Sequence, residues 1–417
     1  MRVPVVIVGA GQAGLAMSRL LGGAGVDHVV FERGEVAQSW RSERWDSLRL
    51  LTPNWMTRLP GWRYQGEDPH GFMTRTEFVA FLERYHRSFD APIRTGVTVQ
   101  RATVAQDGRF VIDTDAGRWV ADALVAATGA SSTSALPNLA TDLPSGMQQI
   151  TAPAYRNPGK LDDGEVLVVG ASASGAQIAE EIQRSGRQVT LAVGEHIRVP
   201  RTYRGRDVHW WMDRVGVLDE AYDEVEDLDR ARRLPSLQLI GSPQRRTLDL
   251  NALVALGVVP VGKLLRVSNG RAQFSGGLAN LVAHADLKQD RLLDRIDEHA
   301  QQYGTDGSGG PDGFDPGPYR PERTDVGRPP TELPLAPFGS VIWATGYQPS
   351  LSWLDPACFD RRGRPNHDGG AAPTTGLFFL GLPFMRRRKS NFIDGVGPDA
   401  EALLPALLAH LVRSSLR

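Results

Sequence analysis

The chain has 417 residues, of which 41% are hydrophobic and 23% are charged, and its formal net charge is −1. This length suffices for two or three domains with cores of their own, and the near-neutral charge excludes nucleic-acid or membrane binding driven by overall charge. No apolar run approaches the roughly 20 residues of a transmembrane helix, so we expect a cytoplasmic protein without stable membrane insertion. The single cysteine, Cys358, excludes an internal disulfide, a dithiol redox pair and a cysteine-rich zinc site, and no metal site is predicted.

A strand–turn–helix pattern begins almost at the N-terminus. The apolar run 5–8 predicts a buried strand, a glycine-rich turn follows at 9–14, and residues 15–21 have helical spacing. The first glycine permits a tight turn, the second lets a pyrophosphate approach the backbone, and the third lets helix and strand pack closely. The helix N-terminus then offers free N–H groups to phosphate oxygens. We therefore expect a dinucleotide to contact Gly9, Gly11, Gln12, Ala13 and Gly14.

An acidic residue stands where this kind of fold binds a ribose. Glu32 ends the next apolar run, 23 residues after Gly9, and a carboxylate there can bind a ribose hydroxyl. Arg33 follows it and is a second candidate for the nucleotide site. The alternative interpretation is a glycine-rich turn in an ordinary α/β domain that binds no nucleotide.

The segment that follows, over 34–60, is less regular and contains several tryptophans and arginines. Such side chains can line a site for a large planar ligand, because arginine binds phosphate and an indole offers an apolar wall. The alternative is a loop packed by its own aromatic residues. The candidate lining residues are Trp40, Arg41, Leu48 and Thr52.

The opening pattern recurs 161 residues later. After a helix predicted over 74–85 and short strands over 93–125, the apolar run 165–169 leads into a second glycine-rich turn at 170–175. The first and third glycines are retained, and the serine in place of the second still allows a close approach and adds a hydroxyl. We predict a second dinucleotide site at Gly170, Ser172, Ser174 and Gly175.

The second unit differs from the first at the ribose position. Val193, 23 residues after Gly170, replaces the acid, so nothing there repels a 2′-phosphate. Arginines that could clamp phosphate follow, which favours NADPH over NADH, although Glu195 lies two residues away and keeps NADH open. These arginines are Arg198, Arg201 and Arg204.

The C-terminal part contains a linker, a repeated tripeptide and a last helix. Glycine and proline crowd 304–334 and predict a loop or linker, and a strand at 340–343 leads into Ala-Thr-Gly at 344–346, which repeats 127–129. Asp394 lies in a turn that enters the last helix, whose N-terminus could face an electron-rich ring.

Two nucleotide loops, two Ala-Thr-Gly segments and no dithiol resemble the class B flavin-dependent monooxygenases, which include the flavin-containing monooxygenases and the Baeyer–Villiger enzymes. The resemblance covers most of the chain. It is carried by both loops, Glu32, Trp40-Arg41, Leu48-Arg49-Leu50 and Ala344-Thr345-Gly346-Tyr347.

The resemblance implies an α/β fold with two Rossmann-like dinucleotide-binding domains. FAD would bind the first loop and NADPH the second, with the NADPH domain (160–303) inserted into a discontinuous FAD domain (1–155 and 335–417) and 304–334 as the loop or linker. It also implies an adenine edge at the backbone near Val99 and interdomain hinges at the two Ala-Thr-Gly segments. Four residues of these hinge segments are also expected to contact the cofactors: Thr128, Gly129, Thr345 and Gly346.

The implied activity is an FAD- and NADPH-dependent monooxygenase, in which a flavin hydroperoxide oxygenates a small organic substrate by N-oxygenation, S-oxygenation or a Baeyer–Villiger reaction. The flavin carries the chemistry, so no catalytic side chain is predicted. The expected partners are the substrate and O₂. The oligomeric state stays open, and a homodimer is one possibility.

One departure keeps other functions open. Thr151 stands at the histidine position of the family signature, with Ser145 and Met147 at its phenylalanine and glycine positions. The alternatives are an NADPH-dependent flavin reductase or oxidase that oxygenates no substrate and, more remotely, a non-catalytic nucleotide-binding protein.

Overall fold

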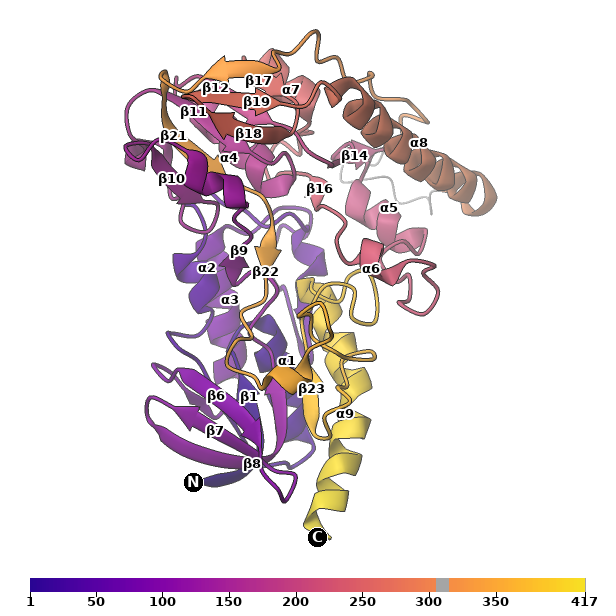
Figure 1. The fold of residues 1–417 in the computed structure, drawn as a ribbon. Helices are drawn as coiled ribbons and strands as arrows, with labels where there is room; N and C mark the ends of the chain where they lie inside the picture. Colours follow the sequence, from indigo (N-terminus) through magenta and orange to yellow (C-terminus); the bar gives the residue numbers. More distant parts are fainter. Residues whose placement is uncertain (305–314, 417) are drawn as a thin grey trace.

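The computed structural model describes residues 1–304 and 315–416. The chain forms two α/β lobes, each built on its own sheet, and both termini lie at the far end of the first lobe (Figure 1). Among the helices of these described residues, none has the length and apolar character needed to cross a membrane.

The first lobe is built on a seven-stranded sheet. Its strands are β1 (Arg2–Val8), β2 (His28–Phe31), β5 (Ile93–Arg94), β6 (Val99–Val104), β7 (Phe110–Thr114), β8 (Gly117–Ala126) and β23 (Leu377–Phe379). Their order is β5-β2-β1-β8-β7-β6, with β23 also paired to β8. The run Val5–Val8 of β1 is buried, as expected for a parallel strand covered on both faces. Helices α1 (Gln12–Gly23) and α9 (Ile393–Ser415) pack against each other beside this sheet.

The second lobe contains a five-stranded sheet that is parallel throughout. Its strands are β10 (Gln148–Thr151), β21 (Phe338–Trp343), β11 (Glu165–Val169), β12 (Val189–Ala192) and β17 (Val259–Val261), in that order. Helix α4 (Ala173–Arg184) follows β11, as α1 follows β1. A three-stranded antiparallel sheet covers this lobe, formed by β18 (Leu264–Ser268), β19 (Arg271–Phe274) and β20 (Glu332–Pro334). The two parallel sheets confirm the predicted α/β class.

Two strands belong to a different lobe from the one to which the expected domain boundaries assign them. Those boundaries placed β10 and β21 in the first unit, yet both strands pair within the second sheet, where β21 lies between β10 and β11. The run Phe338–Trp343 is apolar and buried, and such a run fits the centre of either sheet. Strand pairing therefore decides which lobe it joins.

The chain passes between the lobes twice, and the two connections pair with each other. Strand β9 (Thr133–Ser134) lies on the way out and β22 (Tyr347–Gln348) on the way back, and they form an antiparallel pair between the lobes (Figure 1). The Thr345 hydroxyl donates to the carbonyl oxygen of Ala135 at 2.5 Å, and the amide of Ala135 donates to the carbonyl of Gly346 at 3.0 Å.

The remaining elements are short, apart from α3 and α8. Helix α3 (Arg75–Arg87) begins with a capping box between Thr74 and Glu77. The other helices are α2 (Gln38–Ser42), α5 (Val208–Arg214), α6 (Leu228–Ala231), α7 (Leu250–Ala255) and α8 (Leu278–Tyr303), with 3-10 turns at Asn54–Met56, Asn138–Asp142, Pro158–Lys160 and Pro356–Cys358. The short strands are β3 (Arg58–Leu59), β4 (Trp62–Arg63), β13 (Ile197–Arg198), β14 (Thr202–Tyr203), β15 (Arg206–Asp207) and β16 (Leu237–Gln238).

The expected 304–334 linker is only partly described, because residues 305–314 lie outside the described residues. Its second half runs along α8. Thr324 donates to Asp286 through its amide at 3.0 Å and its hydroxyl at 2.9 Å, and Arg323 pairs with Asp290 at 2.7 Å. A stripe of aspartates on one face of α8 therefore fixes this segment, and β20 ends it.

The stability of the first lobe should depend on one partly buried histidine. The His367 ring lies 5.8 Å from Phe379, and its Nδ1 accepts a hydrogen bond from the amide of Gly370 at 3.3 Å. Burial, helped by the nearby Arg232, lowers the pKa of His367 to about 4. In the unfolded chain the imidazole of His367 takes up a proton near pH 6.5, whereas in the folded chain it does so only near pH 4. The stability that the neutral ring contributes is therefore complete above pH 6.5 and is lost as the pH falls toward 4.

We expect the unfolding free energy of the wild type to fall more steeply between pH 6.5 and 4.5 than that of His367→Asn, by up to about 1.4 kcal/mol per pH unit. The asparagine keeps an acceptor for the amide without titrating. Urea unfolding at several pH values measures the difference, and parallel pH profiles would contradict the assignment.

Candidate functional site

The first glycine-rich loop contains two glycines required for packing and one that faces open space. A Cβ atom on Gly9 would lie 2.5 Å from the carbonyl oxygen of Ala127, and one on Gly14 would lie 1.9 Å from the carbonyl oxygen of Gly9. A Cβ on Gly11 would meet no atom of the described residues within 4 Å. Since Gly11 is also the N-cap of α1 and makes no side-chain cap, the N–H groups of the first turn are open to an anion.

Glu32 is held in place by the same loop. One carboxylate oxygen accepts the amide of Ala10 at 2.8 Å and the other accepts the amide of Gly34 at 3.2 Å. Both oxygens retain lone pairs, so the carboxylate is oriented and can still accept from a ribose hydroxyl. The amide of Val97 donates to the carbonyl of Glu32 at 2.9 Å, which places the strand leading to Val99 beside this carboxylate.

The second loop repeats this geometry. Cβ atoms on Gly170 and Gly175 would lie 2.3 Å from the carbonyl oxygen of Ala344 and 1.8 Å from that of Gly170. Ser172 has φ −78° and ψ −173°, close to the φ −85° and ψ −172° of Gly11. The backbone therefore does not require glycine here, which is why serine is tolerated. Ser236 covers part of this helix start, because its hydroxyl accepts the amide of Ala173 at 3.3 Å.

Each Ala-Thr-Gly segment packs against one of the two glycine-rich loops. Ala127 lies against Gly9 in the first lobe and Ala344 lies against Gly170 in the second. The glycines that follow, Gly129 and Gly346, have φ angles of +81° and +101°, so they turn the chain toward the other lobe. The Thr128 hydroxyl donates to the carbonyl of Ser350 on the returning connection at 3.4 Å.

The predicted lining segment lies between the lobes. Trp40 donates from Nε1 to Gln12 Oε1 at 3.3 Å, which joins it to the first loop. Leu48 and Trp45 are buried in the apolar core of the second lobe. Thr52 is partly buried in the same segment. The segment is thus packed by aromatic residues, but against both lobes rather than only against itself.

Two arginines of this region have internal partners. Arg33 forms an ion pair with Glu43, and Arg41 forms one with Glu83. Their guanidinium groups already contact protein carboxylates, and a contact of either with phosphate stays a prediction.

The predicted phosphate clamp of the second domain is absent. Buried Arg198 donates to Asp249 at 2.9 Å and to Asp286 at 2.6 Å. Arg201 is completely buried and pairs with Asp207 at 2.5 Å. An arginine taken out of water needs such a partner, because an unpaired buried charge is strongly destabilising.

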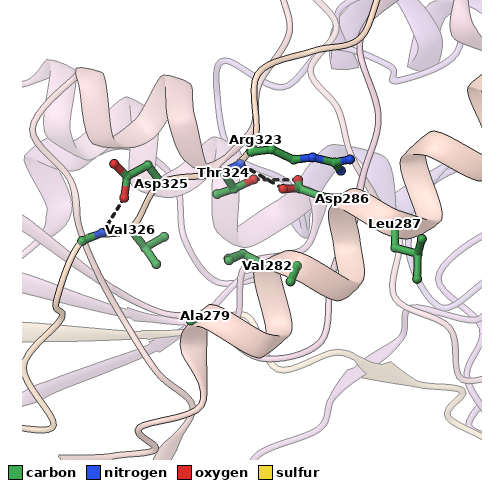
Figure 2. Close-up of a pocket in the computed structure, with 10 residues that line it drawn as sticks. Ala279, Val282, Asp286, Leu287, Arg323, Thr324, Asp325 and Val326 are labelled. Atoms are coloured by element: carbon green, nitrogen blue, oxygen red, sulfur yellow. Dashed lines mark hydrogen bonds between the residues drawn. The ribbon is translucent and has the colours of Figure 1, made fainter.

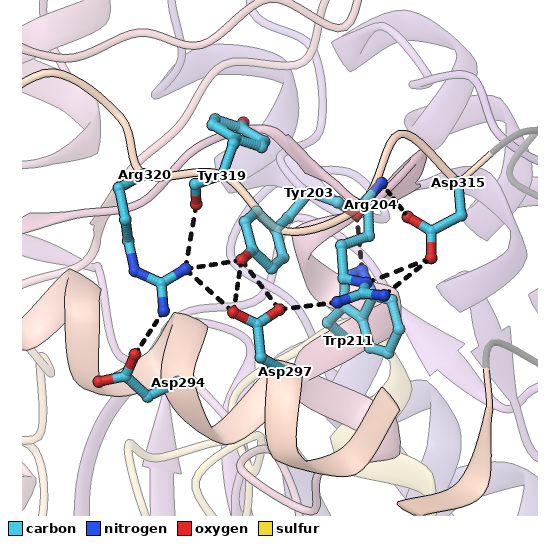
Figure 3. Close-up of polar contacts among 9 residues, drawn as sticks. Tyr203, Arg204, Trp211, Asp294, Asp297, Asp315, Tyr319 and Arg320 are labelled. Carbon is cyan, nitrogen blue, oxygen red and sulfur yellow. Dashed lines mark hydrogen bonds and ion pairs between the residues drawn. The ribbon is translucent and has the colours of Figure 1, made fainter. Parts of the chain in front are cut away.

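Arg204 is held in a network on the surface of α8 (Figure 3). Its guanidinium lies between Asp297 at 3.0 Å and Asp315 at 3.1 Å, while Tyr203 and Arg320 bind the same Asp297. The sequence shows the arginines close together, but the carboxylates that bind Arg198 and Arg204 come from distant elements, and only Asp207, the partner of Arg201, lies nearby in the chain. The clamp prediction is therefore corrected for Arg198, Arg201 and Arg204.

Asp394 has internal partners as well. Arg58 donates to both of its oxygens, at 2.6 and 2.9 Å, and Lys389 Nζ lies 3.7 Å away. Asp394 therefore fixes the start of α9 against the first lobe rather than offering a free carboxylate to a ligand.

Two grooves of about 560 Å³ each lie on the described surface. In the groove between α8 and residues 323–327, the polar groups bind one another: Asp286 accepts from Thr324, and Asp325 accepts from the amide of Gly327 (Figure 2). The other groove has a more mixed lining and adjoins the start of α9, because its Asp213 lies 3.8 Å from Lys389. It is lined by Trp55, His70, Trp210, Asp213 and Arg214.

The sequence interpretation missed three residues near the loops. The Tyr347 hydroxyl lies 3.1 Å from the Ser174 hydroxyl, and Lys288 Nζ lies 2.8 Å from Glu195 just beyond β12. Arg44 lies over the ring of Trp40. Tyr347 directly follows the second Ala-Thr-Gly and Arg44 lies four residues after Trp40, so both positions could have been noticed; Lys288 comes from distant α8 and gave no local signal.

Comparisons with known proteins identify the family. A model of the pyridine nucleotide-disulphide oxidoreductase family matches residues 6–211. An oxidoreductase of Geobacillus kaustophilus, described as CzcO-like and uncharacterized, is 31% identical over 98% of this chain and 99% of its own. The indole-3-pyruvate monooxygenase YUCCA1 of Oryza sativa is 32% identical over 69% of this chain and 74% of its own. The chain belongs to the class B flavin-dependent monooxygenases.

The fold of this monooxygenase agrees with a solved relative. The flavin-containing monooxygenase from Stenotrophomonas maltophilia superposes with a TM-score of 0.68 at 20% identity and covers 98% of this chain and 99% of its own. The enzyme is thus an oxidoreductase of a family that uses FAD and NADPH. Its one cysteine, Cys358, is buried and its pKa is raised by burial, so the disulphide chemistry in the name of the matched family model has no dithiol here.

The two kinds of glycine in the first loop can be separated by mutation. Gly14→Ala places a Cβ against the Gly9 carbonyl, so we expect the apoprotein to lose about 1–3 kcal/mol of stability. Gly11→Ala fits the apoprotein and should leave its unfolding free energy within about 0.5 kcal/mol of wild type, while the added methyl obstructs the pyrophosphate and weakens FAD binding.

Urea unfolding of the apoprotein and FAD titration by fluorescence measure the two effects. Wild-type FAD affinity in Gly11→Ala would show that the pyrophosphate does not lie over this loop.

Proposed function

We propose that this monooxygenase binds FAD at the first loop and NADPH at the second, and transfers one oxygen atom of O₂ to a small organic substrate. The single observation that carries the proposal is the repeated loop: each lobe has a helix start whose first and third glycines are packed against backbone and whose second residue, Gly11 or Ser172, has nearly the same extended backbone conformation and makes no side-chain cap. When bound, the two nucleotides supply the electrons that activate O₂.

The two loops are assigned by their ribose positions. Glu32 carries an oriented carboxylate in the first lobe, whereas the corresponding Val193 is completely buried and apolar. A carboxylate favours a free ribose diol and disfavours a 2′-phosphate, which supports FAD at the first loop and NADPH at the second. Arg198, Arg201 and Arg204 are held by their carboxylates with 14% or less of each side chain exposed. We therefore assign the recognition of the 2′-phosphate to Lys288, which is 26% exposed at the end of β12 and would exchange its ion pair with Glu195 for the phosphate.

The protein's own part in the reaction is to bind and orient the two nucleotides and the substrate and to enclose them between the lobes. Glu32 and the first turn of α1 would hold the FAD ribose and pyrophosphate, and Trp40 would form a wall between the lobes. We place the substrate in the groove lined by Trp55 and Trp210, because it lies next to the Asp394–Lys389 end of α9. Its two indoles and its Asp213 and Arg214 suit a small organic molecule with an apolar body and a polar group. The reaction is N-oxygenation, S-oxygenation or Baeyer–Villiger oxidation.

An NADPH-dependent reductase or oxidase is the second candidate. Thr151, at the histidine position of the family signature, lies in β10, where its carbonyl accepts the amides of Ala154 and Tyr155. An oxidase would return every electron pair to O₂ as hydrogen peroxide.

Isotope labelling separates the two functions. The FAD-loaded enzyme is given NADPH, ¹⁸O₂ and, in turn, a tertiary amine, a thioether and a cyclic ketone. We expect one ¹⁸O atom in the product of at least one substrate class and less than one peroxide per NADPH in that reaction. Peroxide formed in a 1:1 ratio to NADPH with every class would support the oxidase, and an enzyme that NADPH does not reduce would contradict both functions.

The nucleotide preference is tested at Lys288. We expect Lys288→Ala to raise the dissociation constant for NADP⁺ about tenfold, equivalent to about 1.4 kcal/mol, and to leave that for NAD⁺ unchanged, because only NADP⁺ has the 2′-phosphate. Isothermal titration calorimetry measures both. Arg266→Ala removes an exposed cation from β18 of the same lobe and is the matched control. Equal losses for the two nucleotides would rule out the assignment of Lys288.

A further inference from the structure

Arg44 differs from Arg33 and Arg41, two arginines of the same segment, because its guanidinium forms no ion pair with a carboxylate of the described residues. Its Nη1 donates to the carbonyl oxygen of Glu43 at 2.7 Å, and its guanidinium lies 5.1 Å from the ring centre of Trp40. No carboxylate of the described residues forms an ion pair with it; the nearby Glu43 side chain pairs with Arg33 instead. Arg44 is partly buried, and burial lowers its pKa although the nearby Tyr347 and Glu43 act in the opposite direction, so the cation has lost hydration without a direct ion pair to the described residues.

This cation lies where the two lobes meet. Trp40, which Arg44 covers, is hydrogen-bonded to Gln12 of the first loop and packs against the apolar core of the second lobe. Trp45, the next residue after Arg44, is buried in that same core. Tyr347 packs against it too and lies within electrostatic range of the guanidinium.

The backbone around Arg44 is fixed before any ligand arrives. Nη1 of Arg75 donates to the carbonyl oxygens of Arg41 and Arg44 at 3.2 and 3.1 Å. The amide of Asp46 donates to the carbonyl of Arg156 at 2.9 Å, and Arg156 in turn donates to the carbonyl of Ser42. A side chain carried by such a fixed segment loses little further freedom when it binds, which favours a binding role.

The second loop supplies the other half of an anion site. Ser174 lies in the first turn of α4, and its hydroxyl is 3.1 Å from the hydroxyl of Tyr347. The Arg44 guanidinium lies over Trp40 at the same junction of the lobes and within electrostatic range of Tyr347. We propose that Arg44 reaches across from the first lobe to bind the pyrophosphate of the dinucleotide held by the second loop. This rests on the proposed binding of NADPH at that loop.

The chemistry of the nucleotide identifies the group that Arg44 binds. The 2′-phosphate belongs at the end of β12, where Lys288 and Glu195 lie, and the nicotinamide carries no negative charge. The pyrophosphate is the anion that remains, and its oxygens suit the two-pronged geometry of a guanidinium. NADP⁺ and NAD⁺ share this group, so Arg44 should act on both nucleotides alike, unlike Lys288.

The test measures binding rather than turnover. Arg44→Met and Arg44→Lys are prepared as FAD-loaded proteins and titrated by calorimetry with NADP⁺ and with NAD⁺. We expect Arg44→Met to weaken both nucleotides by the same factor, roughly tenfold to a hundredfold, because a charge-assisted contact is lost. Arg44→Lys should recover part of the affinity, since lysine keeps the positive charge but lacks the paired N–H donors of the guanidinium. The ratio of NADP⁺ to NAD⁺ affinity and the FAD content should not change.

The matched control is Arg295→Met, because Arg295 also donates to one backbone carbonyl, that of Val215, and lies on α8. It should bind both nucleotides as the wild type does. Wild-type affinity in Arg44→Met, or a loss confined to NADP⁺, would overturn the proposal. A wild-type protein that binds neither nucleotide would instead overturn the proposed function. If Arg44→Met does not fold, Arg44→Gln decides, because it removes the charge and keeps an amide that can donate to the carbonyl of Glu43: full wild-type affinity for both nucleotides would overturn the pyrophosphate contact.

Discussion

The close approach of two glycine-rich loops to two strand ends is the contact on which the rest of this structure depends. Gly9 lies against the backbone of Ala127, and Gly170 lies against the backbone of Ala344, with no room for a side chain in either place. The chain leaves each lobe just after these alanines, and the two connections pair as β9 and β22. The loops therefore lie at the crossing points between the lobes, so a movement of one lobe changes the surroundings of both nucleotide sites.

The distribution of charge follows from the cost of burying cations. Arg198 and Arg201 are buried because carboxylates there neutralise their charge. Arg198 pairs with Asp249 and Asp286, and Arg201 pairs with Asp207. A cluster of arginines in a sequence thus indicates a phosphate site only when no carboxylate reaches it. Arg44, which has no such partner among the described residues, is the more informative cation.

The segment between the first loop and α3 belongs physically to both lobes. Trp40 contacts the first loop, Trp45 and Leu48 are buried in the core of the second lobe, and Arg201 donates to the carbonyl oxygen of Leu51 at 2.7 Å. This arrangement explains why the segment has no regular pattern: its side chains satisfy two cores at once. It also gives the first lobe a means of acting on a ligand bound by the second.

The sequence by itself determined the two strand–turn–helix units, the α/β class, the resemblance to flavin monooxygenases and the tolerance of serine at position 172. These features depend on glycine spacing and apolar periodicity within a few residues, which the chain carries locally. Only the tertiary structure placed β10 and β21 in the second sheet, gave Arg198, Arg201, Arg204 and Asp394 internal partners and left Arg44 without one. Apart from Arg201 and Asp207, which are six residues apart, these strand and ion pairs join residues far apart in the chain, so no local pattern could reveal them.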